Sequence, residues 1–343
     1  MPGRAFITGL AGPRLTPEEQ SFLREADPWG LILFKRNIEN FAQTFALVES
    51  FRDAVGRVAP VLIDQEGGRV QRLGPPHWPA YPPGAIYGTL YDRDRSAGLA
   101  AARLGARLIA ADLNALGIDV DCLPVADVPV QGADPVIGDR AYGATPDKVA
   151  AIAGAVAEGL LAGGVLPVVK HIPGHGRATA DSHARLPVVE ADRKTLETTD
   201  FVPFRALKHL PLAMTAHIVF TAIDPLAPAT TSAAMIDVIR GSIGYDGALM
   251  SDDIAMGALA GAISTRARSA IAAGCDLVLH CNGRLDEMQA VAGAVPMLSG
   301  ESERRTQAAL AARRDPEPLD TAAARAQFSQ LLAGMAGAGT PSS

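Results

Sequence analysis

Three of the seven histidines of the chain stand in one short segment, VVKHIPGHGRATADSH (168–183). His171 and His175 are four positions apart, a spacing that can place two zinc ligands on one face of a helix. A proline and a glycine lie between them, however, and disfavour a helix. A metal site carried by a loop, with His183 as the third ligand, stays open because zinc accepts ligands from loops. Lys170 would alternatively suit Schiff-base chemistry.

The end of the same segment offers a proton donor. Asp181 and His183 are two positions apart, so their side chains point to the same side of an extended segment. The carboxylate can then accept a hydrogen bond from one imidazole nitrogen while the other nitrogen faces a substrate, which suits a general acid/base near neutral pH. The small and glycine-containing stretch GHGRATADSH predicts a mobile loop that brings this pair over a site.

Charged side chains and histidines also follow short apolar runs elsewhere in the chain. They are Asp64, His217, Asp252, Asp253 and His280, with Arg69 and Arg72 after the third run and Asp139 and Arg140 after the fourth. Each alone has an ordinary structural explanation, such as a helix cap for Asp253 or a surface salt bridge for an arginine. Together, at five strand ends of one sheet, they would need one another or a polar ligand to offset their desolvation. The pattern therefore predicts a polar site.

Asp252 is the candidate nucleophile of that site. The cations Arg72, Arg140 and Lys170 would keep a carboxylate beside them ionised. A carboxylate and a proton donor on either side of one bond form the arrangement of a retaining glycosidase, which normally uses two carboxyl groups. A histidine in place of the second carboxyl group is favourable, because an imidazolium is attracted to the anion whereas a carboxylic acid there needs a raised pKa.

Eight strand-like runs alternate with alanine-rich helical segments and must position these residues. The runs span 5–10, 30–34, 60–64, 118–125, 165–170, 212–217, 247–252 and 275–281, and the helical segments include 97–116, 146–163, 232–240 and 264–273. The runs lack polar alternation, which indicates parallel strands buried on both faces by helices. Eight such units predict an α/β fold of the (β/α)8 TIM-barrel type, whose loops after the strands converge on one site. A doubly wound open sheet is the alternative, but no G-x-G-x-x-G follows an early strand.

The domain organisation follows from the length of 343 residues. This length suits one large barrel with insertions. We expect a single catalytic domain over 1–335, in which the segment 299–335 adds helices outside the barrel. The last residues, 336–343, are expected to form a disordered tail.

The composition of the chain limits the classes of binding partner that we expect. A formal net charge of -6 provides no basic field for a phosphate backbone, so we expect no nucleic-acid partner. No window sustains the roughly 18 apolar residues that span a membrane, and the N-terminus lacks a convincing signal peptide. Cys122, Cys275 and Cys281 show no paired spacing, which indicates buried thiols in a reducing compartment. We expect a cytoplasmic monomer that binds a small molecule and uses no cofactor or metal.

Six sequence blocks resemble one known family. They are DQEGGRVQR (64–72), GDRAYG (138–143), KHIPGHG (170–176), DSH (181–183), MTAHI (214–218) and SDDIAM (251–256). Together, and in this order, they are similar to the bacterial β-N-acetylglucosaminidases of glycoside hydrolase family 3, in the short form without a second α/β domain. Ile172 stands where that family more often has an aromatic residue, and we expect its side chain to pack under the loop.

The resemblance implies a fold, an activity and roles for residues. The fold is a (β/α)8 barrel, and the activity is removal of terminal β-linked N-acetylglucosamine, with retention, from peptidoglycan fragments such as GlcNAc-anhydroMurNAc and muropeptides. Asp252 would be the nucleophile, and His183 with Asp181 the acid/base dyad. The sugar would be held by Asp64, Arg72, Arg140, Lys170 and His171.

Three other functions remain open from the sequence. A metal-dependent hydrolase would use the three loop histidines. An amino-sugar sensor would keep the pocket without chemistry. Transfer of the glycosyl group to phosphate instead of water would use the same residues.

Overall fold

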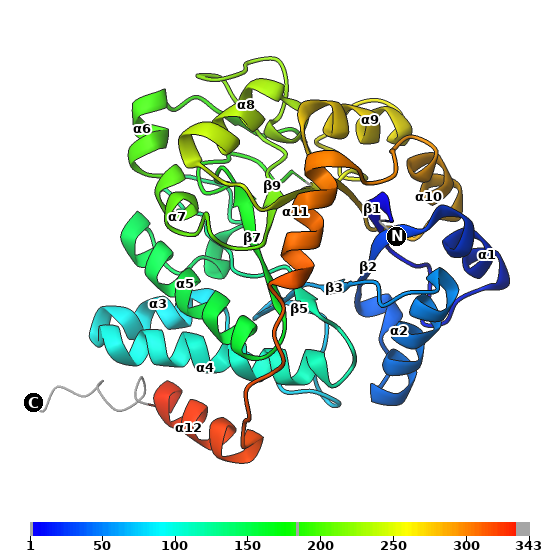
Figure 1. Ribbon diagram of the computed structural model, residues 1–343. Helices are drawn as coiled ribbons and strands as arrows, with labels where there is room; N and C mark the ends of the chain where they lie inside the picture. The colour runs from blue at the N-terminus through cyan, green and yellow to red at the C-terminus, as the bar shows by residue number, and fades with distance from the viewer. Residues whose placement is uncertain (1–2, 183–184, 334–343) are drawn as a thin grey trace, which may run out of the picture.

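The computed structural model describes residues 3–182 and 185–333, and its centre is a closed barrel of eight parallel strands (Figure 1). The strands are β1 (Arg4–Thr8), β2 (Pro28–Leu33), β3 (Val61–Ile63), β6 (Val120–Asp121), β7 (Leu166–Ile172), β9 (Leu212–Thr215), β11 (Ala248–Asp253) and β12 (Leu277–His280). They lie around the barrel in chain order, and β12 pairs with β1, with Thr8 opposite His280, to close it. The predicted TIM-type barrel is confirmed and the open sheet is excluded.

The strands are buried on both faces, as their apolar sequences predicted. All six residues of β2 and all seven of β7 are buried, including Lys170 and His171 at the end of β7. The fourth strand is much shorter than the predicted run 118–125. Only Val120 and Asp121 form the strand, and beyond them a single isolated bridge joins Val125 to Lys170.

Helices surround the barrel (Figure 1). They are α1 (Pro17–Ala26), α2 (Phe41–Val55), α3 (Gly84–Arg93), α4 (Arg95–Asn114), α5 (Pro146–Ala162), α6 (Arg193–Thr198), α7 (Phe201–Ala206), α8 (Ala233–Val238), α9 (Ile263–Ala273) and α10 (Leu285–Ala292). Side-chain caps set several of their starts. Asp94 accepts hydrogen bonds from the backbone of Ser96 and Ala97, which is why α4 begins two residues before the predicted 97.

Two small sheets lie outside the barrel. β4 (Gln65–Gly67) and β5 (Val70–Gln71) form an antiparallel ribbon directly after β3, and β8 (Val188–Val189) pairs in parallel with β10 (Val219–Phe220). The first ribbon makes a tight return after Glu66, where Gly67 and Gly68 have φ angles of 92° and 57° that favour glycine. This return directs Asp64 and Glu66 into the mouth of the barrel.

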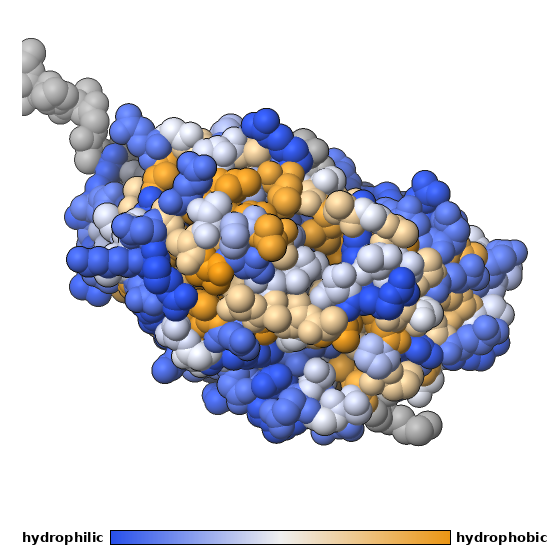
Figure 2. Space-filling model, turned by 90° about the horizontal axis from the view of Figure 1, so that it is seen from above, coloured by the Kyte–Doolittle hydropathy of each residue, from blue (hydrophilic) through white to orange (hydrophobic). Residues whose placement is uncertain are grey.

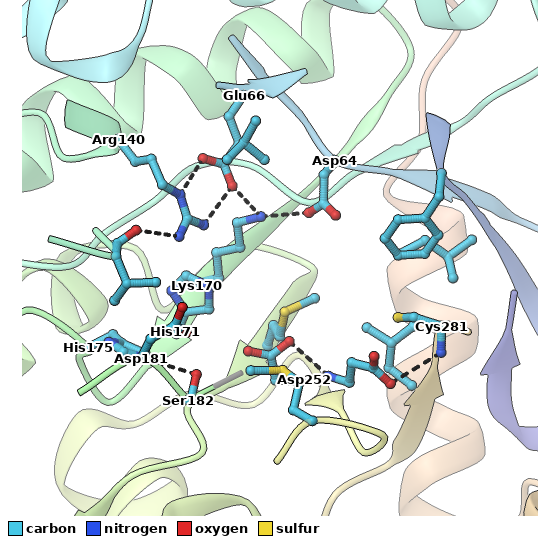
Figure 3. A pocket seen from close by; sticks show the side chains of 18 of the residues that line it. Asp64, Glu66, Arg140, Lys170, His171, His175, Asp181, Ser182, Asp252 and Cys281 are labelled. Carbon is cyan, nitrogen blue, oxygen red and sulfur yellow. Dashed lines mark hydrogen bonds and ion pairs between the residues drawn. The ribbon is translucent and has the colours of Figure 1, made fainter. Parts of the chain in front are cut away.

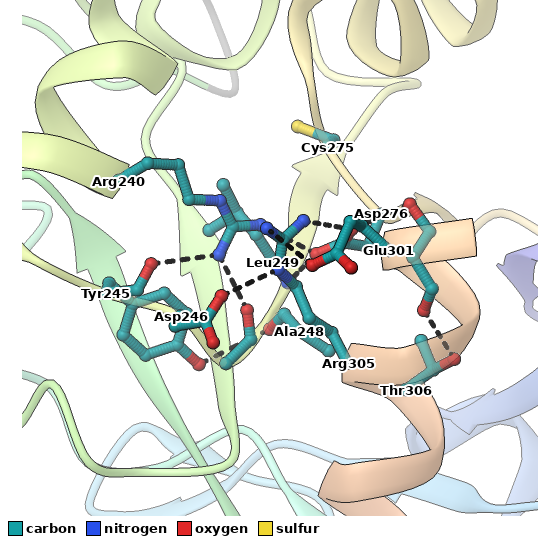
Figure 4. A network of polar contacts seen from close by, with 12 residues as sticks. Arg240, Tyr245, Asp246, Ala248, Leu249, Cys275, Asp276, Glu301, Arg305 and Thr306 are labelled. Carbon is teal, nitrogen blue, oxygen red and sulfur yellow. Dashed lines mark hydrogen bonds and ion pairs between the residues drawn. The ribbon is translucent and has the colours of Figure 1, made fainter.

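The C-terminal helix α11 (Gly300–Ala311) covers the amino-terminal ends of the strands (Figures 1 and 4). Asp276, just before β12, accepts hydrogen bonds from the backbone of Leu249 at 2.9 Å, from Arg240 at 2.7 Å and from Ser302 of α11 at 2.7 Å. Asp119, just before β6, accepts from the backbone of Val61 at 2.7 Å and is 3.3 Å from Arg313, which follows α11. Buried carboxylates therefore anchor both ends of α11.

The last described helix, α12 (Thr321–Ala333), packs on the outside of α4. Phe328 contacts the rings of Tyr81 and Tyr87, and Arg325 pairs with Asp112 at 2.7 Å. Both α11 and α12 lie in the segment 299–335, for which helices outside the barrel were expected. The predicted tail 336–343 lies outside the described residues.

The surface carries mixed polar and apolar residues. Figure 2 looks onto the face at the top of Figure 1, where apolar residues gather toward the middle and hydrophilic residues surround them. Exposed apolar side chains of this kind are ordinary on proteins. None of the described helices is long and apolar enough to cross a membrane. Cys122, Cys275 and Cys281 are buried free thiols, as predicted.

Candidate active site

A pocket of about 280 Å³ opens at the carboxyl ends of the barrel strands. Its lining contains Asp64, Glu66, Arg69, Arg72, Arg140, Lys170, His171, His175, Asp181, Ser182, Asp252, Asp253 and Cys281, with apolar Ile32, Phe34, Val70, Val136, Met214, Met256 and Leu279. The predicted catalytic and sugar-binding residues that the structure describes all line this one cavity, whereas His217, His280 and Asp139, which also follow apolar runs, do not. His183, the predicted acid/base, lies outside the described residues.

A chain of alternating charges forms one side of the pocket (Figure 3). Arg72 contacts Asp64 at 2.9 Å, and Lys170 Nζ lies 2.8 Å from Asp64 Oδ1 and 2.6 Å from Glu66 Oε1. Arg140 pairs with both oxygens of Glu66, each at 2.8 Å. The predicted sugar-binding cations are thus held in fixed positions by two carboxylates before any ligand arrives.

The electrostatics of this chain favour fully ionised groups. Burial alone would raise the pKa of Glu66, but Lys170 and Arg140 outweigh it and lower that pKa to about 2. The same balance, with Lys170 and Arg72 as the cations, lowers the pKa of Asp64. Burial opposes the charge of Lys170, yet Asp64 and Glu66 raise its pKa above the ordinary value. A protonated Lys170 leaves no free amine for a Schiff base.

Asp252 lies across the cavity from this chain (Figure 3). Its Oδ1 accepts a hydrogen bond from the backbone of Asp253 at 2.8 Å, which fixes the orientation of the carboxylate. Burial tends to raise the pKa of Asp252, but the nearby His217 and His171 outweigh it, and the pKa is lowered. Asp252 is therefore an oriented, partly buried carboxylate with a lowered pKa that faces the pocket.

The neighbouring Asp253 has a different environment. Its Oδ1 accepts from the backbone of Ala255 at 3.0 Å and of Cys281 at 3.2 Å, so it caps the turn after β11, as the helix-cap explanation proposed. Burial raises its pKa, and the charge of Asp252 raises it further. The pKa values of the two adjacent aspartates are therefore shifted in opposite directions, which favours Asp252 as the nucleophile.

His217 supports Asp252 from the next strand. It is buried, its Nδ1 is 2.7 Å from the hydroxyl of Thr230, and its Nε2 is 3.0 Å from the backbone carbonyl of Asp253. These contacts hold the ring beside β11. The sequence placed His217 at the rim without a role, and the structure adds that it stabilises the charge of Asp252.

His171 and His175 share one partner, Asp127. Asp127 Oδ2 is 2.7 Å from His171 Nδ1, and Oδ1 accepts from the backbone of His175 at 2.6 Å and of His171 at 3.2 Å. The two rings lie edge to face with centroids 5.6 Å apart. Burial lowers the pKa of His175 to about 4, so this ring is neutral at pH 7.

The described part of the loop after β7 packs against the barrel. The α-carbon of Gly176 lies so close to the carbonyl of Val128 that an added β-carbon would come within 2.0 Å of the oxygen. His175 Nε2 is 3.3 Å from the hydroxyl of Ser182, next to the predicted dyad residue Asp181. Ile172 is buried in the core, consistent with the packing expected for it. The predicted motion of this loop stays a prediction.

The described residues form no metal site of three or more His, Cys, Asp or Glu side chains. In the histidine segment, His171 Nδ1 is engaged by Asp127 and His175 Nε2 by Ser182. A three-histidine site would also require His183, which the structure does not describe.

Sequence reasoning missed two residues of this site, Glu66 and Asp127. Glu66 is two positions after Asp64 in an extended segment, so the spacing that places side chains on one side could have found it. Asp127 follows the apolar run that ends at Val125, and the strand-end criterion applied to the other runs also fits it. Neither was singled out because each lies beyond the last residue of a run.

Comparisons with known proteins agree with this geometry. The model of the glycosyl hydrolase family 3 N terminal domain matches residues 7–313. This chain belongs to glycosyl hydrolase family 3. It is a glycoside hydrolase, and the match covers the barrel and α11.

Similar proteins come from several bacteria. A β-hexosaminidase of Alkalilimnicola ehrlichii is 42% identical over 284 residues, which are 81% of this chain and 80% of the relative. NagZ from Neisseria gonorrhoeae superposes with a TM-score of 0.85 at 33% identity over 99% of both chains, and it has also been solved in complex with N-trifluoroacetyl-D-glucosamine. A family 3 β-N-acetylglucosaminidase from Paenibacillus gives a TM-score of 0.82 at 29% identity, and this chain spans 64% of that longer protein.

Proposed function

We propose that this glycoside hydrolase is a retaining exo-β-N-acetylglucosaminidase. The observation that carries the proposal is the position of Asp252, an oriented and ionised carboxylate that faces a fixed chain of charged sugar-binding groups across one small pocket. The relatives named β-hexosaminidase and the NagZ complex with an amino-sugar ligand support this substrate class. The pocket volume suits one sugar ring in the glycone position.

In the proposed mechanism, the hydroxyl groups of the sugar bind along the chain of charges. Asp64 accepts hydrogen bonds from hydroxyls, while Arg72, Arg140 and Lys170 donate to sugar oxygens. His171, at the end of β7, is the remaining side chain that binds the sugar. These side chains are already oriented by their ion pairs, so little side-chain entropy is lost when the sugar binds.

Two displacements then cleave the bond. A carboxylate oxygen of Asp252 attacks the anomeric carbon, the bond to the leaving oxygen breaks, and protonated His183, paired with Asp181, gives its proton to that oxygen. Neutral His183 next takes a proton from a water molecule, which attacks the anomeric carbon and releases Asp252. Two inversions at one carbon give net retention.

We further propose that the substrates are muropeptides and related peptidoglycan fragments, processed in the cytoplasm by a monomer without a cofactor. The net charge of -6 and the buried free thiols support a small-molecule substrate and a reducing compartment.

Covalent trapping tests the proposal. An aryl N-acetyl-β-glucosaminide should be hydrolysed, and a 2-fluoro or 5-fluoro glycosyl inactivator should label one residue, located by peptide mass spectrometry. We expect the label on Asp252, none in Asp252→Asn, and an unchanged label in the surface variant Asp237→Asn. A label on another residue would overturn the assignment, and a folded protein that binds the sugar without hydrolysis would be a sensor.

A further inference from the structure

Asp127 is a fully buried carboxylate that the proposed mechanism does not use. It follows the short strand β6, next to the end of β7, where the backbone of Ala126 donates to the carbonyl of Lys170 at 2.6 Å. No sugar-binding role is available to it, because Asp127 is not among the residues that line the pocket. Its contacts are instead with the two histidines of the loop after β7.

The two oxygens of Asp127 have different partners. Oδ1 accepts from the backbone N–H groups of His171 and His175 at 3.2 and 2.6 Å, while Oδ2 faces His171 Nδ1 at 2.7 Å. Burial raises the pKa of Asp127, but His171 and His175 lower it to about 2, so it is an anion at neutral pH. An anion can only accept, and His171 must therefore carry a proton on Nδ1.

We propose that Asp127 is a positioning residue for this reaction, which holds His171 as the Nδ1–H tautomer with Nε2 directed to the sugar site and anchors the start of the loop that carries Ser182. The inference rests on the proposed glycosidase function. A single buried carboxylate then holds both His171, which lines the pocket with Asp252, and the loop that carries Asp181 and Ser182.

His175 connects Asp127 to the part of the loop that carries Ser182. Its backbone is fixed by Asp127, and its Nε2 lies 3.3 Å from the hydroxyl of Ser182. Ser182 is buried and adjacent to Asp181, and its carbonyl accepts from the backbone of Ala258 at 3.1 Å, after β11. The loop is thus tied at one end to Asp127 and at the other to the segment after Asp252.

A carboxamide cannot replace this carboxylate. In Asp127→Asn, the amide oxygen is needed by the two backbone N–H groups, so the amide nitrogen must face His171 Nδ1. A donor at this position requires Nδ1 to accept, which moves the ring proton to Nε2.

Other charged groups lie near Asp252 and His171, and these groups must stay unchanged in the test. His217 from the end of β9, Lys170 from β7 and Asp253 from β11 surround Asp252, and His175 lies against His171. None of them contacts Asp127 except His175, through its backbone.

The first test is the tautomer of His171, read from 15N chemical shifts of histidine-labelled protein. We expect the Nδ1–H form in the wild type and the Nε2–H form in Asp127→Asn. The matched control is Asp276→Asn, which changes a buried aspartate at the other end of the barrel and should leave His171 as Nδ1–H. An Nε2–H form in the wild type, or no change in Asp127→Asn, would overturn the proposal.

The second test is kcat/KM on the aryl glycoside. Asp127→Asn should lower kcat/KM roughly 10- to 100-fold, as for other partners that orient an imidazole. Asp127→Glu, which restores an anionic acceptor for Nδ1–H, should recover most of this loss. A kcat/KM of Asp127→Asn equal to that of the wild type, or an equal loss in Asp127→Glu, would contradict the proposal. A wild type without glycosidase activity would refute the proposed function instead, while the tautomer still reports on Asp127.

Discussion

Lys170 Nζ lies 2.6 Å from Glu66 Oε1, and neither side chain exposes more than 4% of its surface. Such a pair contributes little net stability by itself, because desolvation offsets its attraction, but removing one partner leaves a buried charge without compensation. The pair also links Arg72 and Arg140 through Asp64 and Glu66. The Lys170–Glu66 ion pair must therefore be intact for the proposed sugar-binding side chains to keep their positions.

We predict that Glu66→Gln lowers the free energy of unfolding by about 3 kcal/mol at pH 7. This value corresponds to a pKa of Glu66 that drops from an ordinary 4.5 to about 2, and it lies at the low end of the cost of breaking a buried pair. Urea unfolding of both proteins measures it. The control Glu197→Gln, which breaks a half-exposed pair with Arg193, should cost less than about 1 kcal/mol.

The difference between wild type and Glu66→Gln should depend on pH in a defined window. Because the pKa of Glu66 is lowered in the folded state, its contribution is complete above about pH 4.5 and disappears as the pH falls toward 2. The two unfolding curves should converge over this range. A difference that stays constant down to pH 2 would show that Glu66 acts through shape and not through charge.

Asp252→Ala should abolish turnover, because no other group is positioned to attack the anomeric carbon. Sodium azide can occupy the space left by the carboxylate and attack in its place. We expect azide to restore product formation from an activated aryl glycoside and to give the α-glycosyl azide, identified by NMR. Residual hydrolysis at the wild-type rate, or a β-azide, would contradict a nucleophilic role.

His183→Ala tests the acid/base role of a residue that the structure does not describe. The loss should be roughly 10²- to 10⁴-fold on substrates whose leaving group needs a proton. For a dinitrophenyl leaving group, the loss in the first displacement should be much smaller, because no proton is required. Pre-steady-state and steady-state rates on the two substrates measure the difference, and equal losses would argue against general acid catalysis.

Dialysis against EDTA should leave kcat unchanged. The proposed steps need only a carboxylate and an imidazole, and the described contacts of His171 and His175 already engage one ring nitrogen of each. Activity on an aryl glycoside and metal content by mass spectrometry check this outcome. A loss that stoichiometric zinc restores would instead support the metal-dependent hydrolase.

The sequence was sufficient to predict the barrel because all eight strands combine an apolar run with burial on both faces. It also predicted which side chains meet, since Asp64, Lys170 and Asp252 directly end or follow such runs. It did not predict Glu66 and Asp127, because their importance comes from the partners that folding brings to them, two cations for Glu66 and two histidines for Asp127. The opposite pKa shifts of Asp252 and Asp253 likewise depend on backbone donors and on His217, which only the folded chain brings together.

The helix α11 has a consequence for the order of events during synthesis. Asp119 precedes the fourth strand and pairs with Arg52, and Asp276 precedes the eighth strand and pairs with Arg240. Each aspartate gains a second guanidinium partner, Arg313 or Arg305, only from the segment 305–313. A chain still on the ribosome can therefore assemble all eight strands before these second partners emerge, after about nine-tenths of the polypeptide, and a product truncated before α11 lacks them.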